Sequence, residues 1–364
     1  MANIRDVARL AGVSSMTVSR VVNGTGYTSQ ETRARVERAI AELGYVPNAV
    51  ARQLRSKRSH TIALVVTDIT NPFFTTIARG VEDEAAGRDF GVMFCNTDES
   101  DAEEIAYLQM LIQRQVDGVL LVPASNSGNS LRLLHAHRVP VVVIDRRVRS
   151  TQIDEVRTDS EAGAYALVRH LVELGHRNIA MLSGRREIST SVDRVAGYRR
   201  ALAEVGVEVD SRLVLYRGYD ADAGLRMARE ILDATPRPTA IFAANNFIAF
   251  GAMRALREAG IRVPDDMSVV AFDDLPDAWV MDPFMTVINQ PAYDIGRRAA
   301  ELLLERLTAA PAGAGRKCVL PGKLVVRGSS APPSRLPATD GNGGAGPVRG
   351  TGARARRHEG IARC

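Results

Sequence analysis

Apolar residues recur with a helical period in the first 46 residues of the chain. The segment IRDVARLA (4–11) carries them at i, i+3, i+4 and i+7, which predicts a short helix with one buried face. A second helix follows Ser14, a residue type that caps helix N-termini, and places three valines on its inner side. A third helix is expected from about Gln30 to Leu43, with Gly44 as its stop. The sequence therefore predicts three short helices around one small core.

The link between the first two of these helices has the composition of a tight turn. It reads AGVS (11–14), and Gly12 can adopt the positive φ that such a turn needs. Two helices joined in this way, with a third to close the core, make a helix-turn-helix, whose second helix offers its N-terminal residues to DNA base edges. Here those residues are Ser15, Met16 and, one turn later, Arg20. A plain three-helix bundle with a solvated polar face is the alternative.

Residues 47–60 read as a conditional hinge. Pro47 ends the third helix, Asn48 can cap the next one, and residues 49–56 are long enough for two helical turns. A helix of that length is well below the ~12–15 residues that are stable alone in water, so it is expected to order only against a partner. Its small apolar strip consists of Ala51 and Leu54, flanked by basic side chains.

From Thr61 the pattern changes to short, continuous apolar runs separated by amphipathic stretches. The runs are TIALVVT, FGVMFCN, GVLLV and PVVVID, and then NIAMLS, TAIFAAN and MSVVAF. Continuous rather than alternating apolar strands are typical of parallel sheets covered by helices on both faces. The alternation occurs twice, split near residues 155–160, which predicts an α/β core of two lobes, each a doubly wound parallel sheet. Ligands of such sheets bind at the carboxyl ends of the strands, here in the cleft between the lobes.

Charge is distributed unevenly along the chain, whose formal net charge is +5. Residues 1–60 carry ten Lys or Arg and four Asp or Glu, a net of +6, whereas residues 61–330 carry a net of −5. A basic head on a mildly acidic body favours DNA as the partner of the predicted helix-turn-helix. Residues 331–364 carry a net of +4 and are rich in Pro, Gly and Arg, which predicts disorder. This tail is either an extension without a role or an auxiliary contact to DNA.

Several classes of protein find no support in the sequence. Cys95, Cys318 and Cys364 have neither disulfide nor metal spacing, and His135 and His137 are two apart on a predicted helix and so face different ways. A GNGGAG match at 341–346 lies in the low-complexity tail, with no strand before it and no helix after it. We therefore expect no metal, no cofactor and no enzymatic activity. No apolar run approaches the ~18 residues of a membrane span, and the start of the chain lacks the apolar stretch of a signal peptide, so a cytoplasmic, nucleoid-associated protein is expected.

Eight motifs follow one another in unbroken order over about residues 2–330. They are IRDVARLAGVSSMTVSRVVNG, LGYVPNAVARQLRSKRS, ITNPFF, VVVIDRR, LGHRNIAML, RVAGYRRAL, AANNFIAFGAMRAL and VVAFDDLPDAWVMDPFMTVINQP. Together they resemble the LacI/GalR family of bacterial transcription regulators. The resemblance implies a homodimer that binds a palindromic DNA operator through its helix-turn-helix and hinge helix. It also implies a core, similar to periplasmic sugar-binding proteins, that binds a small effector and responds allosterically. We expect a repressor, and leave open whether the effector releases or strengthens DNA binding.

The residue patterns and the family resemblance together predict four parts of the chain. Residues 2–46 form the helix-turn-helix, 47–60 the hinge helix and linker, 61–330 the two-lobed core, and 331–364 the tail. Within the core, the first lobe is expected to comprise about 61–158 and 290–316, and the second about 159–289 and 317–330.

The resemblance also implies roles for residues of the DNA-binding region. Ser15 and Met16 take the positions of the variable specificity readers, Arg20 that of a base or phosphate contact, and Leu54 that of a wedge in the minor groove. Met16 departs from the polar residue often found there, so an apolar contact with a thymine methyl group is expected. The full set of DNA-binding candidates is Asn3, Ser15, Met16, Thr17, Ser19, Arg20, Asn23, Asn48, Ala51, Leu54 and Arg55.

A second set of positions is implied to bind the effector. Asp and Arg side chains together can bridge vicinal hydroxyls, and aromatic rings can stack on a sugar or a purine. The candidates are Asn71, Phe73, Phe74, Asp145, Thr190, Arg194, Tyr219, Asn245, Asp273 and Gln290. Asn246 departs from the Asp that the family usually has after this Asn, so no role is assigned to it. A sugar or sugar derivative is expected, with a purine or nucleoside as the alternative. A stand-alone sugar-binding protein and an α/β enzyme are rival interpretations of the same core.

Overall fold

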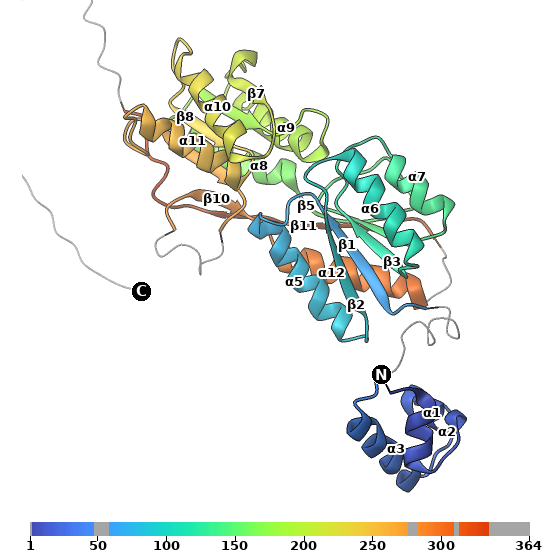
Figure 1. Cartoon of the computed structure of the whole chain (residues 1–364). Helices are drawn as coiled ribbons and strands as arrows, with labels where there is room; N and C mark the ends of the chain where they lie inside the picture. Colours follow the sequence, from blue (N-terminus) through green and yellow to red (C-terminus); the bar gives the residue numbers. More distant parts are fainter. Residues whose placement is uncertain (1, 47–57, 276–282, 309–312, 335–364) are drawn as a thin grey trace, which may run out of the picture. The chain divides into compact units, whose positions relative to one another are not determined.

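The computed structural model describes residues 2–46, 58–275, 283–308 and 313–334 (Figure 1). Four of the DNA-binding candidates, Asn48, Ala51, Leu54 and Arg55, lie outside the described residues, as does the tail from residue 335 onward. The described chain contains a small helical headpiece and two lobes, each built on a six-stranded sheet. The α/β class predicted from the apolar runs is therefore confirmed.

The headpiece consists of three helices with the predicted bounds. They are α1 (Ile4–Ala11), α2 (Ser15–Asn23) and α3 (Gln30–Leu43). Each helix begins at a side-chain cap and ends at a glycine of positive φ, with Gly12 at +64° forming the turn between α1 and α2. Val7, Val18 and Val36, one from each helix, are completely buried and form the centre of the core. Close packing of small β-branched side chains thus fixes the angle at which α2 is presented.

The first lobe is an entirely parallel sheet with helices on both faces. Its strands lie in the order β11-β5-β4-β3-β1-β2. The bounds are β1 (Thr61–Val66), β2 (Gly91–Asn96), β3 (Gly118–Leu121), β4 (Val141–Ile144), β5 (Asp154–Thr158) and β11 (Lys317–Leu320). On one face, Leu64 packs with α5 (Pro72–Ala86) and α12 (Ala292–Thr308). On the other, Val65 packs with α6 (Asp101–Gln113) and α7 (Asn129–Ala136).

The second lobe repeats this plan with one antiparallel edge. Its strand order is β12-β10-β9-β8-β6-β7, and only β10 and β12 pair in antiparallel fashion. The strands are β6 (Ile179–Ser183), β7 (Val214–Tyr216), β8 (Ala240–Ala243), β9 (Ser268–Phe272), β10 (Thr286–Asn289) and β12 (Lys323–Val325). The helices are α8 (Ser160–Glu173), α9 (Ser189–Ala203), α10 (Ala221–Leu232) and α11 (Asn246–Glu258), with a short 3-10 turn at Ser211–Leu213.

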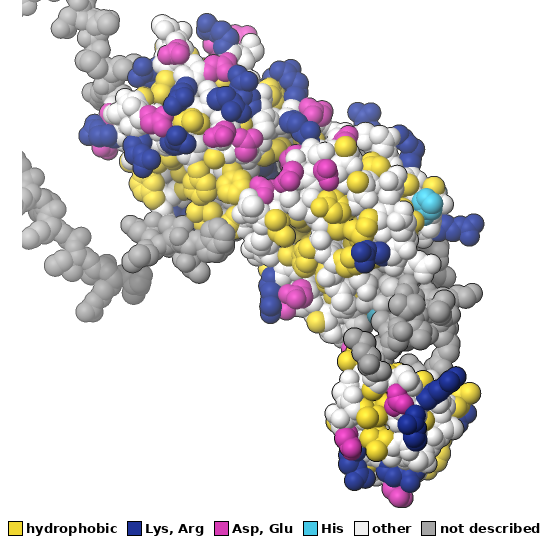
Figure 2. Space-filling view, viewed as in Figure 1, with side chains coloured by type: hydrophobic (Ala, Val, Ile, Leu, Met, Phe, Trp, Pro, Cys, Tyr) yellow, Lys and Arg dark blue, Asp and Glu magenta, His cyan; other side chains and the backbone are white. Residues whose placement is uncertain are grey.

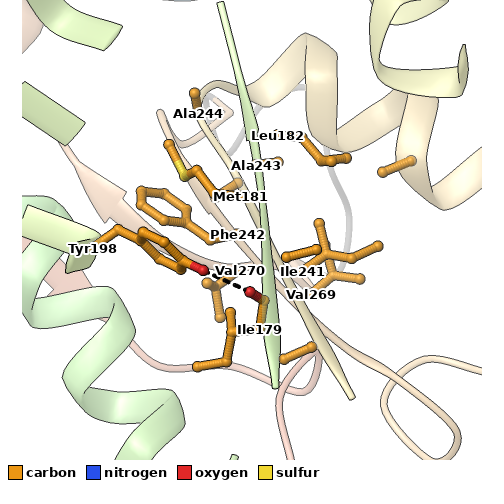
Figure 3. Close-up of a cluster of buried hydrophobic side chains, with 14 of the residues drawn as sticks. Ile179, Met181, Leu182, Tyr198, Ile241, Phe242, Ala243, Ala244, Val269 and Val270 are labelled. Carbon is orange, nitrogen blue, oxygen red and sulfur yellow. Dashed lines mark hydrogen bonds between the residues drawn. The ribbon is translucent and has the colours of Figure 1, made fainter. Parts of the chain in front are cut away.

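The buried apolar side chains of the second lobe form one continuous cluster. Figure 3 shows Tyr198 of α9 among the apolar side chains of β6, β8 and β9, with Phe242 of β8 among them. The Tyr198 hydroxyl donates a hydrogen bond of 2.8 Å to the carbonyl oxygen of Ile179, so the one polar atom of this large side chain is satisfied. Burial raises the pKa of the Tyr198 phenol, which therefore stays neutral.

The chain crosses between the lobes at three places, and one of them lies later than the sequence suggested. The crossings follow β5, β10 and β11. β11 pairs with β5 in the first sheet, so residues 317–320 belong to the first lobe and not, as predicted, to the second. Its position depends on a distant anchor, because the Arg316 backbone N–H donates to the carboxylate of Asp154 at 2.6 Å. The residues KCVL (317–320) give no sign of this contact, so the sequence could not predict it.

Helices within each lobe approach one another at glycines. A Cβ atom on Gly80 of α5 would lie 2.1 Å from the carbonyl oxygen of Tyr293 on α12, and one on Gly296 would lie 2.0 Å from that of Ile77. The α8–α9 and α10–α11 pairs make the same close approach, at Gly197 and Gly251. Because such separations exclude any side chain, each helix pair is held in a single register.

Within the described ranges, no helix is both long enough and apolar enough to cross a bilayer.

Candidate functional site

A cavity of about 430 Å³ lies between the lobes, where the carboxyl ends of strands from both sheets converge. Both lobes contribute side chains to its wall. All ten effector candidates predicted from the sequence line it: Asn71, Phe73, Phe74, Asp145, Thr190, Arg194, Tyr219, Asn245, Asp273 and Gln290. The structure therefore brings together residues that are spread over more than 200 positions of the sequence.

Two carboxylates occupy equivalent places at the ends of β4 and β9. Asp145 and Asp273 both have a left-handed backbone, with φ of +64° and +67°. The Asp145 N–H donates to the carbonyl oxygen of Val156 at 3.0 Å, and the Asp273 N–H to that of Ile288 at 3.1 Å, so each is pinned to the neighbouring strand. A positive φ is unusual for a non-glycine residue and turns both side chains away from the strand direction. The two lobes thus present matching carboxylates to the same cavity.

Arg194 is a buried cation of the same cavity wall, and its charge opposes the rise in the pKa of both carboxylates. Its guanidinium donates to the carbonyl oxygen of Ala244 at 2.6 Å and lies 4.1 Å from the ring centroid of Phe272, and the side chain is only 3% exposed. Burial raises the pKa of Asp273 to about 6, although Arg194 and a hydrogen bond from Gln290 oppose that shift. Burial raises the pKa of Asp145 as well, again against the field of Arg194. Arg194 lies in the second turn of α9 (Ser189–Ala203).

Tyr219 closes one side of the cavity through its hydroxyl group. That hydroxyl lies 2.9 Å from the Thr190 hydroxyl and 2.7 Å from that of Ser191, both in the first turn of α9. The ring lies against Gly184, where a Cβ atom would be 2.1 Å from Cζ of Tyr219. Any larger residue at position 184 would therefore displace the ring from the cavity wall.

Helix caps fix the two asparagines. Asn71 caps α5, accepting from the Phe73 N–H at 3.0 Å, and Asn245 caps α11, accepting from the Ile248 N–H at 2.8 Å. Asn245 also donates to the carbonyl oxygen of Tyr219 at 2.9 Å. Phe73 and Phe74 meet edge to face with ring centroids 5.1 Å apart, and both are largely buried. Capping and packing thus account for part of what these residues do, beside their place in the cavity wall.

Several polar atoms that are buried around the cavity have no partner within the protein. Among the described residues these include Oγ1 of Thr67, Nε of Arg194 and Oε1 of Gln290. Buried polar groups are normally hydrogen-bonded, and leaving one unsatisfied costs about 1–3 kcal/mol. A ligand that carries both donors and acceptors would satisfy them.

Sequence reasoning missed six charged residues of the cavity wall, Asp68, Asp98, Glu99, Arg146, Arg185 and Asp220, and three of them form one cluster. The carboxylate of Glu99 pairs with the guanidiniums of both Arg146 and Arg185. Arg146 follows Asp145 directly, so its place at a strand end was a usable signal. Glu99 and Arg185 sit in loops of different lobes, and nothing in the sequence indicates that they meet.

Asn246 was also left without a role, and the structure gives it a contact between the lobes. The amide groups of Asn71 and Asn246 each donate to the other, both at 3.1 Å. The two side chains are buried, at 5% and 4% exposure. This reciprocal pair closes the cavity on the side of α5 and α11.

The headpiece presents the predicted reading residues on one surface of α2. Met16 is 63% exposed, Arg20 is exposed and Ser15 is partly so, whereas Val18 and Val21 on the same helix face the core. Figure 2 shows basic side chains gathered on the headpiece surface. Met16 is therefore accessible to an external partner.

Other DNA-binding candidates in the headpiece form hydrogen bonds within it. Asn3 caps α1, accepting from the Arg5 N–H at 2.9 Å, and the Thr17 hydroxyl lies 2.9 Å from that of Ser14. The Asn23 amide reaches back to Ser19, one turn earlier. These bonds orient the side chains and leave further donors and acceptors for a partner. Tyr27, missed in the sequence, is 92% exposed in the loop after α2 and is a further candidate.

Comparisons with known proteins agree with both parts of this geometry. Residues 3–48 match the family described as bacterial regulatory proteins, lacI family, and residues 59–320 match the family described as periplasmic binding proteins and sugar binding domain of LacI family. The chain belongs to the LacI family. The resemblance drawn from its motifs is therefore confirmed.

Individual LacI-family relatives cover almost the whole chain. The transcriptional repressor PurR of Vibrio atlanticus (strain LGP32) is 37% identical over 308 residues, which are 84% of this chain and 92% of that protein. The structure of a complex of the transcriptional regulator CelR with cellobiose has a TM-score of 0.69 at 37% identity, covering 91% of this chain and all of that one. The lac repressor dimer bound to operator and the anti-inducer ONPF has a TM-score of 0.79 at 30% identity, with 91% and 99% covered. The predicted fold is thereby confirmed, and these relatives are transcriptional regulators.

Proposed function

We propose that this LacI-family regulator is a repressor that binds a palindromic operator as a homodimer and changes its operator affinity when a small sugar occupies the cavity between its lobes. Its place of action is then the nucleoid in the cytoplasm. The exposed face of α2 carries the reading residues, with Arg20 suited to a bidentate contact with guanine and Met16 to a thymine methyl group. The relative solved as a dimer on its operator supports this assignment.

One observation supports the effector class: the buried carboxylates of Asp145 and Asp273 and the buried guanidinium of Arg194 line the same cavity, and the charge of Arg194 acts on both carboxylates. Carboxylates accept hydrogen bonds from hydroxyl groups, and a guanidinium donates to hydroxyl oxygens, so this set matches adjacent hydroxyls on a ring. The unpaired Nε of Arg194 and Oε1 of Gln290 add one donor and one acceptor. A relative with this fold is solved with cellobiose and another with ribose.

A thermal-shift screen tests the effector class. The full chain is heated with panels of neutral mono- and disaccharides and, separately, of purines and nucleosides, since a bound ligand stabilises the folded state by mass action. We expect several degrees of stabilisation from at least one sugar. Stabilisation by purines alone would show the sugar assignment to be wrong and establish the alternative.

A gel-shift assay tests the DNA-binding function. DNA from the upstream region of the chain's own gene is titrated at several salt concentrations, with a shuffled fragment of equal length as the control. We expect preference for a fragment with an inverted repeat and a steep loss of affinity with salt. Binding that shows neither would refute the proposal and favour a stand-alone sugar-binding protein. Measurable turnover of a bound sugar would instead favour an α/β enzyme.

A further inference from the structure

Glu99 sits between two guanidinium groups at the wall of the cavity. Its Oε2 accepts from Arg146 at 2.9 Å and from Arg185 at 3.1 Å, and its Oε1 accepts a second bond from Arg146. Arg146 follows β4 in the first lobe, and Arg185 follows β6 in the second. One carboxylate therefore holds two arginines that come from opposite sides of the cavity.

Backbone contacts position both arginines for this pairing. Arg146 is only 4% exposed and also donates to the carbonyl oxygen of Pro123 at 2.6 Å, while Arg185 donates to that of Ala124. Burial disfavours the charged guanidinium of Arg146, but Glu99 outweighs it and raises the pKa of Arg146. Both cations are fixed in place before any ligand arrives.

Two converging guanidiniums are the arrangement that binds a phosphate or a carboxylate group of a ligand. Here the protein's own carboxylate takes that position. Glu99 and its neighbour Asp98 both have positive φ, +58° and +48°, so the turn after β2 is shaped to bring the side chain to this point. The site that could hold a ligand anion is therefore already filled from within.

The other charged side chains of the cavity wall also disfavour an anionic ligand. The acidic members are Asp68, Asp98, Glu99, Asp145, Asp220 and Asp273, and the basic ones are Arg146, Arg185 and Arg194, which leaves three more acidic than basic side chains. Figure 2 shows acidic side chains where the two lobes meet. Like charges brought together at low dielectric repel strongly, so a phosphorylated or acidic sugar would be disfavoured here.

We propose that Glu99 determines specificity by acting as an internal anion: it neutralises Arg146 and Arg185, so that the cavity accepts a neutral polyhydroxylated ligand and rejects sugar phosphates and sugar acids. The inference rests on the proposed effector cavity and adds the charge class of its ligand. Removal of this one carboxylate is expected to turn the cavity into a site for anionic sugars.

Glu99→Gln is the variant that tests this role, because it keeps the size of the side chain and removes the charge. Wild type and variant, as full chains, are titrated by calorimetry with glucose, glucose 6-phosphate, ribose, ribose 5-phosphate and inorganic phosphate at constant ionic strength. We expect no measurable binding of the three phosphates to the wild type. We expect an increase of about tenfold or more in their affinity for Glu99→Gln, because two charge-assisted donors become free.

Two further variants make the result specific. Glu103→Gln removes an exposed charge four residues away on α6, outside the cavity wall, and should leave phosphate affinity unchanged. Arg185→Gln added to Glu99→Gln removes one of the two freed cations and should abolish most of the gained affinity. Equal gains in the Glu103 and Glu99 variants would show a general charge effect and overturn the proposal.

The wild type alone provides a test even if Glu99→Gln fails to fold. A sugar phosphate that binds the wild type at least as tightly as its neutral parent sugar would overturn the proposal, as would a folded Glu99→Gln that gains no affinity for any phosphate. Neither result would touch operator binding in the gel-shift assay, whose failure is the separate sign that the proposed function is wrong.

Discussion

Replacing Asp273 with asparagine should stabilise the ligand-free protein and remove its response to sugar. The Asp273 carboxyl is buried, and its pKa rises from an ordinary 3.8 to about 6. Each pKa unit corresponds to about 1.4 kcal/mol, so holding this group ionised in the folded state costs about 3 kcal/mol at pH 7.5. Asparagine resembles the neutral acid and can still accept the hydrogen bond from Gln290. Asp273→Asn should therefore raise the free energy of unfolding by up to about 3 kcal/mol.

The pH dependence fixes the sign of this effect. Since the folded-state pKa lies above the unfolded one, the folded protein binds the proton more tightly between pH 4 and pH 6. Asp273 therefore adds to wild-type stability as the pH falls through about 6, and its destabilising effect disappears only below the unfolded-state pKa of 3.8. The advantage of Asp273→Asn over the wild type should be full at pH 7.5, about half as large near pH 5, and small near pH 4.

Urea unfolding of the full chain, followed by circular dichroism at pH 4.5, 6.0 and 7.5, measures this difference. Asp222→Asn is the matched control, because Asp222 is exposed in the first turn of α10, and its replacement should change stability little at each pH. The same variants are then heated with the sugar that stabilises the wild type. A less stable Asp273→Asn at pH 7.5, or a gain that does not vary with pH, would refute the reasoning.

Three more substitutions address other parts of the chain. Asp154→Asn removes the buried carboxylate that Arg306 and Arg316 share and should cost about 1–3 kcal/mol in urea unfolding, because both arginines are partly exposed. These arginines outweigh burial and lower the pKa of Asp154, so its stabilisation is present above about pH 4 and is lost as the pH falls toward the folded-state value. Gly184→Ala should displace the Tyr219 ring and abolish sugar-induced stabilisation in the thermal-shift assay while operator binding persists. Arg20→Ala should weaken operator binding by about 1–3 kcal/mol in gel shifts and relax preference at one base pair.

Controls for these substitutions are available in the same chain. Glu173→Gln removes an exposed partner of Arg169 and should change stability little, unlike Asp154→Asn. Gly87→Ala adds a Cβ where the nearest atoms are 3.6 Å away and should leave the sugar response intact, and an equal loss in both glycine variants would contradict the role given to Gly184. Arg33→Ala changes a charged residue of α3 outside the reading surface of α2. An equal loss of preference at the same base pair in Arg20→Ala and Arg33→Ala would count against Arg20 as a base contact.

The sequence predicted the elements whose signals are local. The three headpiece helices have side-chain caps, a periodic apolar face and a terminal glycine, and their bounds came out as predicted. The long apolar strands were equally plain. The sequence did not predict β5, because DEVRT contains no run of apolar residues. Its acidic residue Asp154 is buried together with a partner, Arg306, that lies far along the chain. β11 was assigned to the wrong lobe for the same reason.

The residues of the cavity also divide into those that the sequence could predict and those that it could not. Asp145 and Asp273 were predicted from the family resemblance, and each ends an apolar strand, the position from which a parallel sheet directs side chains to its cleft. Glu99, Arg185 and Asn246 could not be predicted, since each has a partner in the other lobe. Residues of this second kind are visible only when the two sheets are brought together.

The glycine contacts between helices determine where this molecule can deform. A backbone carbonyl packed about 2 Å from the position of a missing Cβ leaves the paired helices no room to slide, so each lobe is mechanically stiff. In the described chain, the segments with most room to deform are then the three short connections between the lobes, which follow β5, β10 and β11. Gln290 stands in one of these connections and holds Asp273 in the cavity wall. A ligand that contacts Gln290 and Asp273 would therefore touch one of the three segments that connect the lobes.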